Sequence, residues 1–74
     1  MREQRSMAIY TFGEALQYLK IGHKASRSEW GDNIFVFYDN EKNTMFKKIN
    51  NIWSPWEVPQ GDLLAEDWVV IKSV

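Results

Sequence analysis

The chain has 74 residues, a single histidine, no cysteine and a formal net charge of −1. It is long enough for one domain, it has neither disulfides nor thiolate metal sites, and its charge argues against a binder of duplex DNA. No apolar run approaches the roughly 20 residues that span a bilayer, so we expect a soluble cytoplasmic protein that requires no cofactor.

The first residues are polar and carry no secretory signal pattern. We expect residues 1–7 to be a flexible leader and residues 8–74 to form a single domain. The short apolar, β-favouring segment 8–10 predicts a first strand. There is no internal repeat, low-complexity stretch or linker that would indicate a second unit.

The best-supported helix follows this segment. Thr11 and Glu14 have the spacing of a capping box, in which each side chain pairs with the backbone of the other residue. Apolar residues then recur at helical spacing from Phe12 to Leu19. Gly22 is placed to end the helix in a left-handed conformation.

Three later segments favour strands: 23–27, 34–38 and 44–49. Turn signals fall at 30–33, and residues 39–43 read as a hairpin loop. The segment 34–38 is apolar at every position, whereas a strand with one solvated face would alternate. We therefore expect this strand to be covered on both faces, by the helix and by a neighbouring subunit.

The C-terminal part predicts a turn at Asn50-Asn51, an irregular segment 52–59 and a last buried strand 68–71. Two prolines disfavour a helix or a central strand in the irregular segment. Asp62 is expected to cap a short helical turn over 63–65. The sum is an α+β fold: a small antiparallel sheet of about four strands, one N-terminal helix, and a short helical turn before the last strand.

The sequence does not favour an enzyme. His23 follows a helix C-terminus, where the helix dipole alone favours a histidine. Glu66 and Asp67 are adjacent, so in an extended segment they point to opposite faces, which is poor spacing for an acid–base pair. The four glycines are isolated from one another, and none belongs to a phosphate-binding loop.

Rings and one guanidinium are the candidate ligand-binding groups. Eleven large rings are many for so small a core, and exposed rings tend to mark interfaces or pockets. Arg27 and Trp30 could together grip a base and its phosphate, or Arg27 could pack its stem on a core tryptophan. Trp53 and Trp56 flank a proline and could stack on a purine or lie in a subunit interface. These alternatives remain open.

Trp68 heads an apolar strand, which favours a core position over a ligand platform. Asp67 directly precedes it and either caps backbone N–H groups or accepts hydrogen bonds from a ligand. The candidate ligand-binding set is therefore Arg27, Trp30, Trp53, Trp56, Asp67 and Trp68.

Three blocks of the sequence carry a family resemblance. The longest runs from Gln60 to Trp68 and reads Gln-Gly-Asp-Leu-Leu-Ala-Glu-Asp-Trp. The other two are Phe12-Gly13-Glu14-Ala15-Leu16, with Leu19, Lys20 and Gly22, and Ala25-Ser26-Arg27-Ser28-Glu29-Trp30. In these blocks the chain resembles the type-two Thoeris anti-defence family of small phage proteins.

The resemblance implies a cytoplasmic phage protein that assembles as a homotetramer. It also implies that the protein sequesters a cyclic ADP-ribose-type or cyclic oligonucleotide signal without cleaving it, and that Arg27, Trp30, Asp67 and Trp68 form or support the pocket. The alternative function is a small phage adaptor that binds a host protein through an aromatic patch at Trp53 and Trp56.

Overall fold

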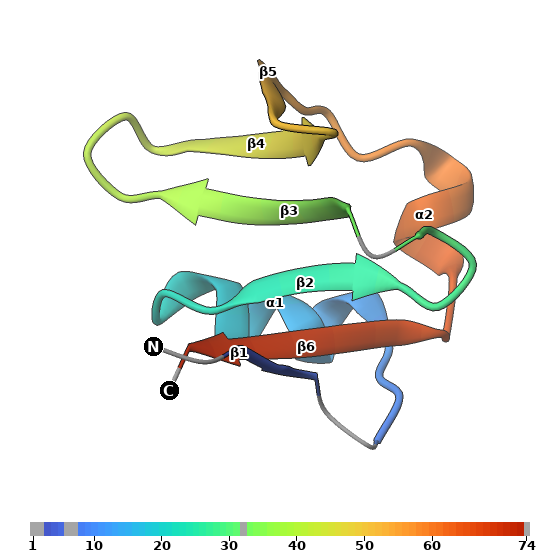
Figure 1. The fold of residues 1–74 in the computed structure, drawn as a ribbon. Helices are drawn as coiled ribbons and strands as arrows, with labels where there is room; N and C mark the ends of the chain where they lie inside the picture. The colour runs from blue at the N-terminus through green and yellow to red at the C-terminus, as the bar shows by residue number, and fades with distance from the viewer. Residues whose placement is uncertain (1–2, 6–7, 32, 74) are drawn as a thin grey trace.

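One antiparallel sheet and two helices make up the computed structural model, which describes residues 3–5, 8–31 and 33–73. The sheet has six strands in the order β1-β6-β2-β3-β4-β5, and the helix α1 lies across one of its faces (Figure 1). The α+β prediction is confirmed. The elements are β1 (Glu3–Arg5), α1 (Phe12–Lys20), β2 (Lys24–Arg27), β3 (Ile34–Asp39), β4 (Thr44–Ile49), β5 (Ile52–Pro55), α2 (Gln60–Leu64) and β6 (Trp68–Ser73).

The helix α1 begins where the sequence predicts. The backbone N–H of Glu14 donates to the Thr11 hydroxyl at 3.3 Å, and the Glu14 carboxylate accepts from the Thr11 backbone N–H at 2.9 Å. Gly22 follows the end of the helix with φ +102°, a conformation that residues with a side chain rarely adopt. Both terminal signals of this helix are confirmed.

The hydrophobic core lies between α1 and the sheet. Phe12, Ala15 and Leu19 recur on one face of the helix and are buried. They meet buried residues of the central strands, namely Ala25 of β2, Val36 of β3, and Trp68 and Val70 of β6. We call the side of the sheet that packs on α1 the inner face, and the opposite side the outer face.

Asparagine and aspartate residues shape the two hairpins at the β4 side of the sheet. Asn50 and Asn51 have φ of 49° and 71° and join β4 to β5 as a two-residue turn. Positive φ at both positions is the signature of the turn type that matches strand twist, and asparagine tolerates it. In the β3–β4 hairpin, Asp39 accepts backbone N–H bonds from Glu41 and Lys42. The predicted turns at 39–43 and 50–51 are confirmed.

The sheet is wider than predicted because both of its edges were read as irregular or flexible. Within the expected leader, residues 3–5 form β1 beside β6, and residues 1–2 and 6–7 lie outside the described part of the chain. Within 52–59, Ile52–Pro55 pairs with β4 as an edge strand. The Trp56 backbone N–H donates to the Met45 carbonyl of β4. Successive N–H groups of a strand point to opposite sides, so Pro55, which has no N–H, lies at a position that faces away from the sheet.

Two local predictions are wrong. The segment 8–10 is not a strand: Tyr10 alone forms an isolated bridge to Trp68, because the helix begins directly after it. Asp62 is not a helix cap: it lies inside α2, whose N-cap is Pro59 with no side-chain hydrogen bond. The Asp62 carboxylate instead accepts a hydrogen bond from Arg27. In the described residues, no helix has the length and apolar character needed to cross a membrane.

Candidate functional site

The outer face of the sheet carries a cluster of rings and ammonium groups. Side chains alternate between the two faces of a strand. Since Val36 is buried against α1, its neighbours Phe35 and Phe37 point to the outer face. The strand register places Lys48 opposite Phe35, and Trp53 of β5 opposite Lys48. Three neighbouring strands thus contribute to one surface.

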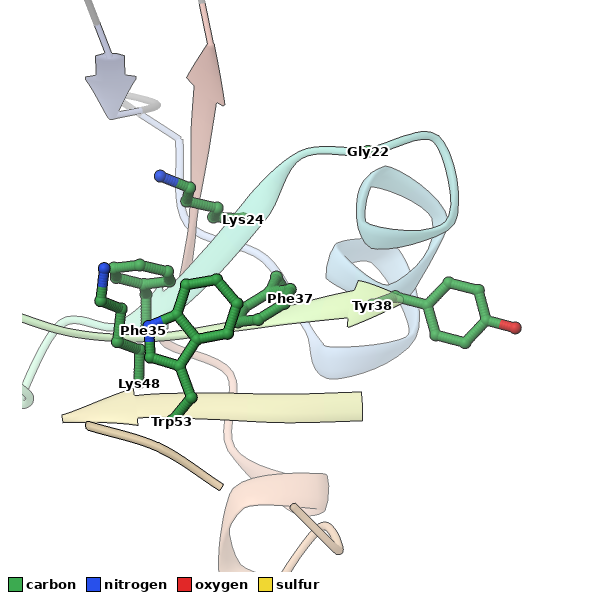
Figure 2. A pocket seen from close by; sticks show the side chains of 7 residues that line it. All are labelled: Gly22, Lys24, Phe35, Phe37, Tyr38, Lys48 and Trp53. Carbon is green, nitrogen blue, oxygen red and sulfur yellow. The ribbon is translucent and has the colours of Figure 1, made fainter. Parts of the chain in front are cut away.

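This surface is hollowed. A cavity of about 210 Å³, which we call the outer hollow, is lined by Gly22, Lys24, Phe35, Phe37, Tyr38, Lys48 and Trp53. Figure 2 shows the rings of Phe35, Phe37 and Trp53 close together, with α1 behind the sheet, while the Tyr38 ring points away from them. The hollow is therefore built on strands, which hold their side chains more rigidly than loops do.

The rings pack against one another, and the Phe37–Trp53 pair meets edge to face. The Phe37 and Trp53 centroids are 4.8 Å apart with planes at 72°, and those of Phe35 and Phe37 are 6.3 Å apart. Phe46 stacks behind Phe37 at 5.7 Å. The Trp53 side chain nevertheless stays 58% exposed. A large ring held in place by neighbours and still open to solvent can stack against a planar ligand.

The charged groups of the outer hollow are both lysines. The Lys24 Nζ lies 4.7 Å from the Phe35 centroid. The Lys48 Nζ lies 5.7 Å from the same centroid and 5.1 Å from the Trp53 ring. Among the residues that line the hollow, none carries a carboxylate. Positive charge beside open rings suits a ligand that combines a flat ring with an anionic group.

Arg27, in contrast, is fully engaged within the chain. Its Nε donates to Asp67 at 2.9 Å, its Nη1 to Asp62 at 2.8 Å and its Nη2 to Glu29 at 3.2 Å. The Ser28 hydroxyl donates to the second Asp67 oxygen at 2.9 Å. The hydrogen bond from Arg27 lowers the pKa of Asp67, and the Asp67 partner raises the pKa of Arg27. The network joins β2, α2 and the start of β6.

Three of the tryptophans form one cluster on the inner face. Trp68 is fully buried, and its indole N–H donates to the Asp62 carbonyl at 2.9 Å. Trp30 and Trp56 pack edge-on against it, with centroids 5.3 Å and 6.2 Å away, and Phe12 completes the cluster at 5.2 Å. These rings are core and core-lining groups.

The predicted site residues therefore occupy three different places. Arg27 and Asp67 belong to the ion-pair network, and Trp30, Trp56 and Trp68 belong to the inner tryptophan cluster next to it. Trp53 alone lies in the outer hollow. Trp53 and Trp56 lie on opposite faces of the sheet because they are three positions apart, and side chains of an extended chain alternate between the two faces.

Sequence reasoning missed the other residues of the outer hollow. A signal was present: the run 34–38 is apolar on both faces, and the prediction that its second face is covered pointed to this surface. The pairing of Lys48 with Phe35 and Trp53 depends on strand register, which the sequence alone does not specify. The residues missed are Gly22, Lys24, Phe35, Phe37, Tyr38 and Lys48.

A second, larger hollow of about 480 Å³ lies beside α1 and is lined by Tyr10, Glu14, Gln17, Tyr18 and Ile21. A hydrogen bond with Tyr18 raises the pKa of Tyr10. Its one charged lining group is the Glu14 carboxylate, which already caps α1. This hollow is a poor site for an anion, so we take the outer hollow as the candidate site. Among the described residues, no group of three or more metal-ligating side chains comes together.

The fold and the site together define a class. This is a small α+β protein with one antiparallel sheet, packed on a helix on one face and bearing an aromatic, lysine-lined hollow on the other.

Comparison with known proteins gives the family. The model of the Tad2-like family, described as the Thoeris anti-defense 2-like domain, matches residues 10–71. The Thoeris anti-defense 2 protein of Bacillus phage SP01 is 36% identical over 84 aligned residues, which cover 84% of this chain and 94% of that protein. The chain belongs to the Thoeris anti-defense 2-like family, as the sequence resemblance predicted. This membership supports a phage anti-defence role.

Proposed function

We propose that the protein binds a cyclic nucleotide-type immune signal, a cyclic ADP-ribose isomer or a cyclic oligonucleotide, and sequesters it without cleaving it. The observation that carries the proposal is the outer hollow, where an exposed indole and two phenylalanine rings meet two lysine ammonium groups. Such a signal offers flat bases for the rings and phosphates for the lysines. Capture takes place in the cytoplasm of the infected host.

The required affinity is within reach of these contacts. Holding a signal below the level that activates its receptor takes nanomolar affinity, about −12 kcal/mol. Stacking on an aromatic ring contributes about 1–3 kcal/mol per base, and a charge-assisted hydrogen bond about 1.5–3 kcal/mol. Rings that are already packed together, as Phe37 and Trp53 are, lose little freedom on binding.

The size of the outer hollow favours a site completed by a second copy of the chain. Its volume of about 210 Å³ is below the roughly 300–1,000 Å³ of ligand pockets that enclose a drug-sized molecule. We propose a homo-oligomer, a tetramer, in which a partner covers the ligand and the outer face of β3.

Binding without turnover is consistent with the lining side chains. Rings and ammonium groups hold an anion, whereas phosphodiester or glycosidic cleavage calls for a nucleophile or an acid–base pair. Among the described residues that line the outer hollow, there is no carboxylate, imidazole, serine or threonine. The Lys24 and Lys48 ammonium groups suit charge recognition.

Isothermal titration calorimetry with cyclic ADP-ribose isomers and cyclic dinucleotides tests the proposal. We expect nanomolar binding of at least one of them, and a loss of about 5- to 150-fold in Trp53→Ala when one base stacks on this ring. The matched control is Ile52→Ala, an exposed neighbour that points to the other face of β5. Absence of binding to every compound by the intact protein would refute the proposal, as would a ligand chemically altered after incubation.

The second candidate function is an adaptor that binds a host protein. The exposure of Trp53, at 58%, favours it, because large exposed apolar groups mark protein interfaces. The patch would centre on Trp53 and not on Trp56, which packs in the inner cluster. A pull-down from host lysate distinguishes the two functions. An adaptor would recover a specific host protein, which Trp53→Ala would lose, whereas a ligand-sequestering protein would recover a nucleotide.

A further inference from the structure

The position of Lys48 distinguishes it from every other lysine described in the chain. Its ammonium group is shared between two rings of the outer hollow, Phe35 at 5.7 Å and Trp53 at 5.1 Å. Figure 2 shows the Lys48 side chain running beside both rings. A planar ligand that stacks on Trp53 from within the hollow approaches to roughly 3.5–4 Å. The ammonium group, 5.1 Å from the Trp53 centroid, borders that space, and we infer that a ring stacking there displaces it.

The displacement has different consequences for neutral and anionic ligands. Any planar ligand that stacks on Trp53 breaks the contact of Lys48 with the two rings. A neutral ligand gives the displaced ammonium group nothing in return, whereas a ligand with a phosphate gives it a charge-assisted partner. The described structure shows no carboxylate within ion-pair distance of the Lys48 ammonium group, so the phosphate does not have to compete with one.

We propose that Lys48 determines the specificity of the outer hollow: in the free protein its ammonium group lies over the rings of Phe35 and Trp53, and it admits anionic planar ligands in preference to neutral ones. The inference rests on the proposed function of the outer hollow and adds to it a reason for discrimination against abundant neutral nucleosides and bases.

Lys47 supplies a matched control. It is the neighbour of Lys48 on β4, but it points to the inner face, where its Nζ lies 4.0 Å from the Trp30 centroid. Lys47→Met and Lys48→Met each remove one positive charge from the same strand, together with one cation–π contact for Lys47 and two for Lys48. They differ in the face that is affected, so long-range charge effects cancel in the comparison.

The test compares adenosine with adenosine 5′-diphosphate, which present the same base with and without negative charge, in NMR titrations of the intact protein and both variants. We expect the diphosphate to bind the intact protein more tightly. Lys48→Met should weaken diphosphate binding roughly tenfold and strengthen adenosine binding about two- to fivefold, whereas Lys47→Met should change neither affinity. We expect the two rings to shift the Lys48 ε-methylene resonances upfield in the free protein, and diphosphate binding to move these resonances back downfield.

The outcomes separate this inference from the proposed function. If the intact protein binds cyclic nucleotides tightly but Lys48→Met changes adenosine and diphosphate binding by the same factor, Lys48 does not set specificity, and the inference alone is wrong. The same conclusion follows if Lys47→Met alters the ratio of the diphosphate and adenosine affinities as much as Lys48→Met does. If the intact protein binds neither cyclic nucleotides nor the diphosphate, both the inference and the proposed function are wrong.

Discussion

Replacing Arg27 with methionine is expected to destabilise the fold more than any other single substitution of a charged residue in the described chain. The Arg27 guanidinium connects β2 to Asp62 in α2 and to Asp67 before β6, with N···O distances of 2.8 and 2.9 Å. These side chains are 15%, 14% and 27% exposed, so water only partly replaces the lost partner. The substitution leaves two carboxylates facing an apolar side chain.

The magnitude follows from these contacts. A hydrogen bond to a charged group contributes about 1.5–3 kcal/mol, and breaking a buried ion pair by removing one partner costs about 3–5 kcal/mol. Partial exposure of Asp67 reduces this figure, and the third contact, to Glu29 at 62% exposure, adds at most about 1 kcal/mol. We expect Arg27→Met to lower the free energy of unfolding by about 2–4 kcal/mol.

Urea unfolding followed by tryptophan fluorescence measures this loss, since Trp68 donates to the Asp62 carbonyl and reports on the same region. Arg27→Lys is the matched variant: it keeps the charge but loses the planar fork, so it should recover only part of the stability. The reasoning is wrong if Arg27→Met unfolds at the same urea concentration as the unchanged protein. Unchanged stability with lost ligand binding would return Arg27 to the ligand site.

Three further predictions concern single contacts. Arg27 lowers the pKa of Asp67 in the folded state, so the stability that this carboxylate contributes is complete above its ordinary pKa and is lost as the pH falls through the lowered pKa. Asp67→Asn should therefore flatten the decline of the unfolding midpoint between about pH 5 and 2. An unchanged decline in this variant would contradict the prediction. Gly22→Ala should cost about 1–2 kcal/mol by thermal unfolding, since φ is +102°, and an unaltered melting temperature would exclude the left-handed conformation. Thr11→Ala removes half of the capping box and should cost about 0.5–2 kcal/mol in the same assay, whereas no loss would mean that the cap is dispensable.

Local signals made much of the fold predictable. The capping box at Thr11 and Glu14, the helix end at Gly22 and the asparagine turn at 50–51 each depend on residues close in sequence, and the structure confirms all three. The strands at the two sheet edges were missed because their sequences lack such local signals. Residues 3–5 pair with 71–73 at the far end of the chain, and residues 52–55, although they pair with 46–49 across a two-residue turn, include a proline that disfavours a central strand.

The candidate site was less predictable because it depends on which face of the sheet each residue occupies. The sequence left open whether Arg27 grips a ligand together with Trp30 or packs on a core tryptophan, and the observed contact of Arg27 with Asp62 joins residues 35 positions apart. Trp53 was singled out for its ring. Its partners Phe37 and Lys48 come from two other strands, and a shift of one residue in register would have placed them on the inner face.

The most direct test of the account is mass spectrometry of the small molecule that co-purifies with the protein from cells producing the immune signal, after heat release, beside Trp53→Ala. The account predicts an intact cyclic nucleotide-type molecule, stoichiometric with its binding sites, that is much reduced with Trp53→Ala and retained with Ile52→Ala. Recovery of a cleaved product, or equal recovery from the Trp53→Ala variant, would contradict capture in the outer hollow.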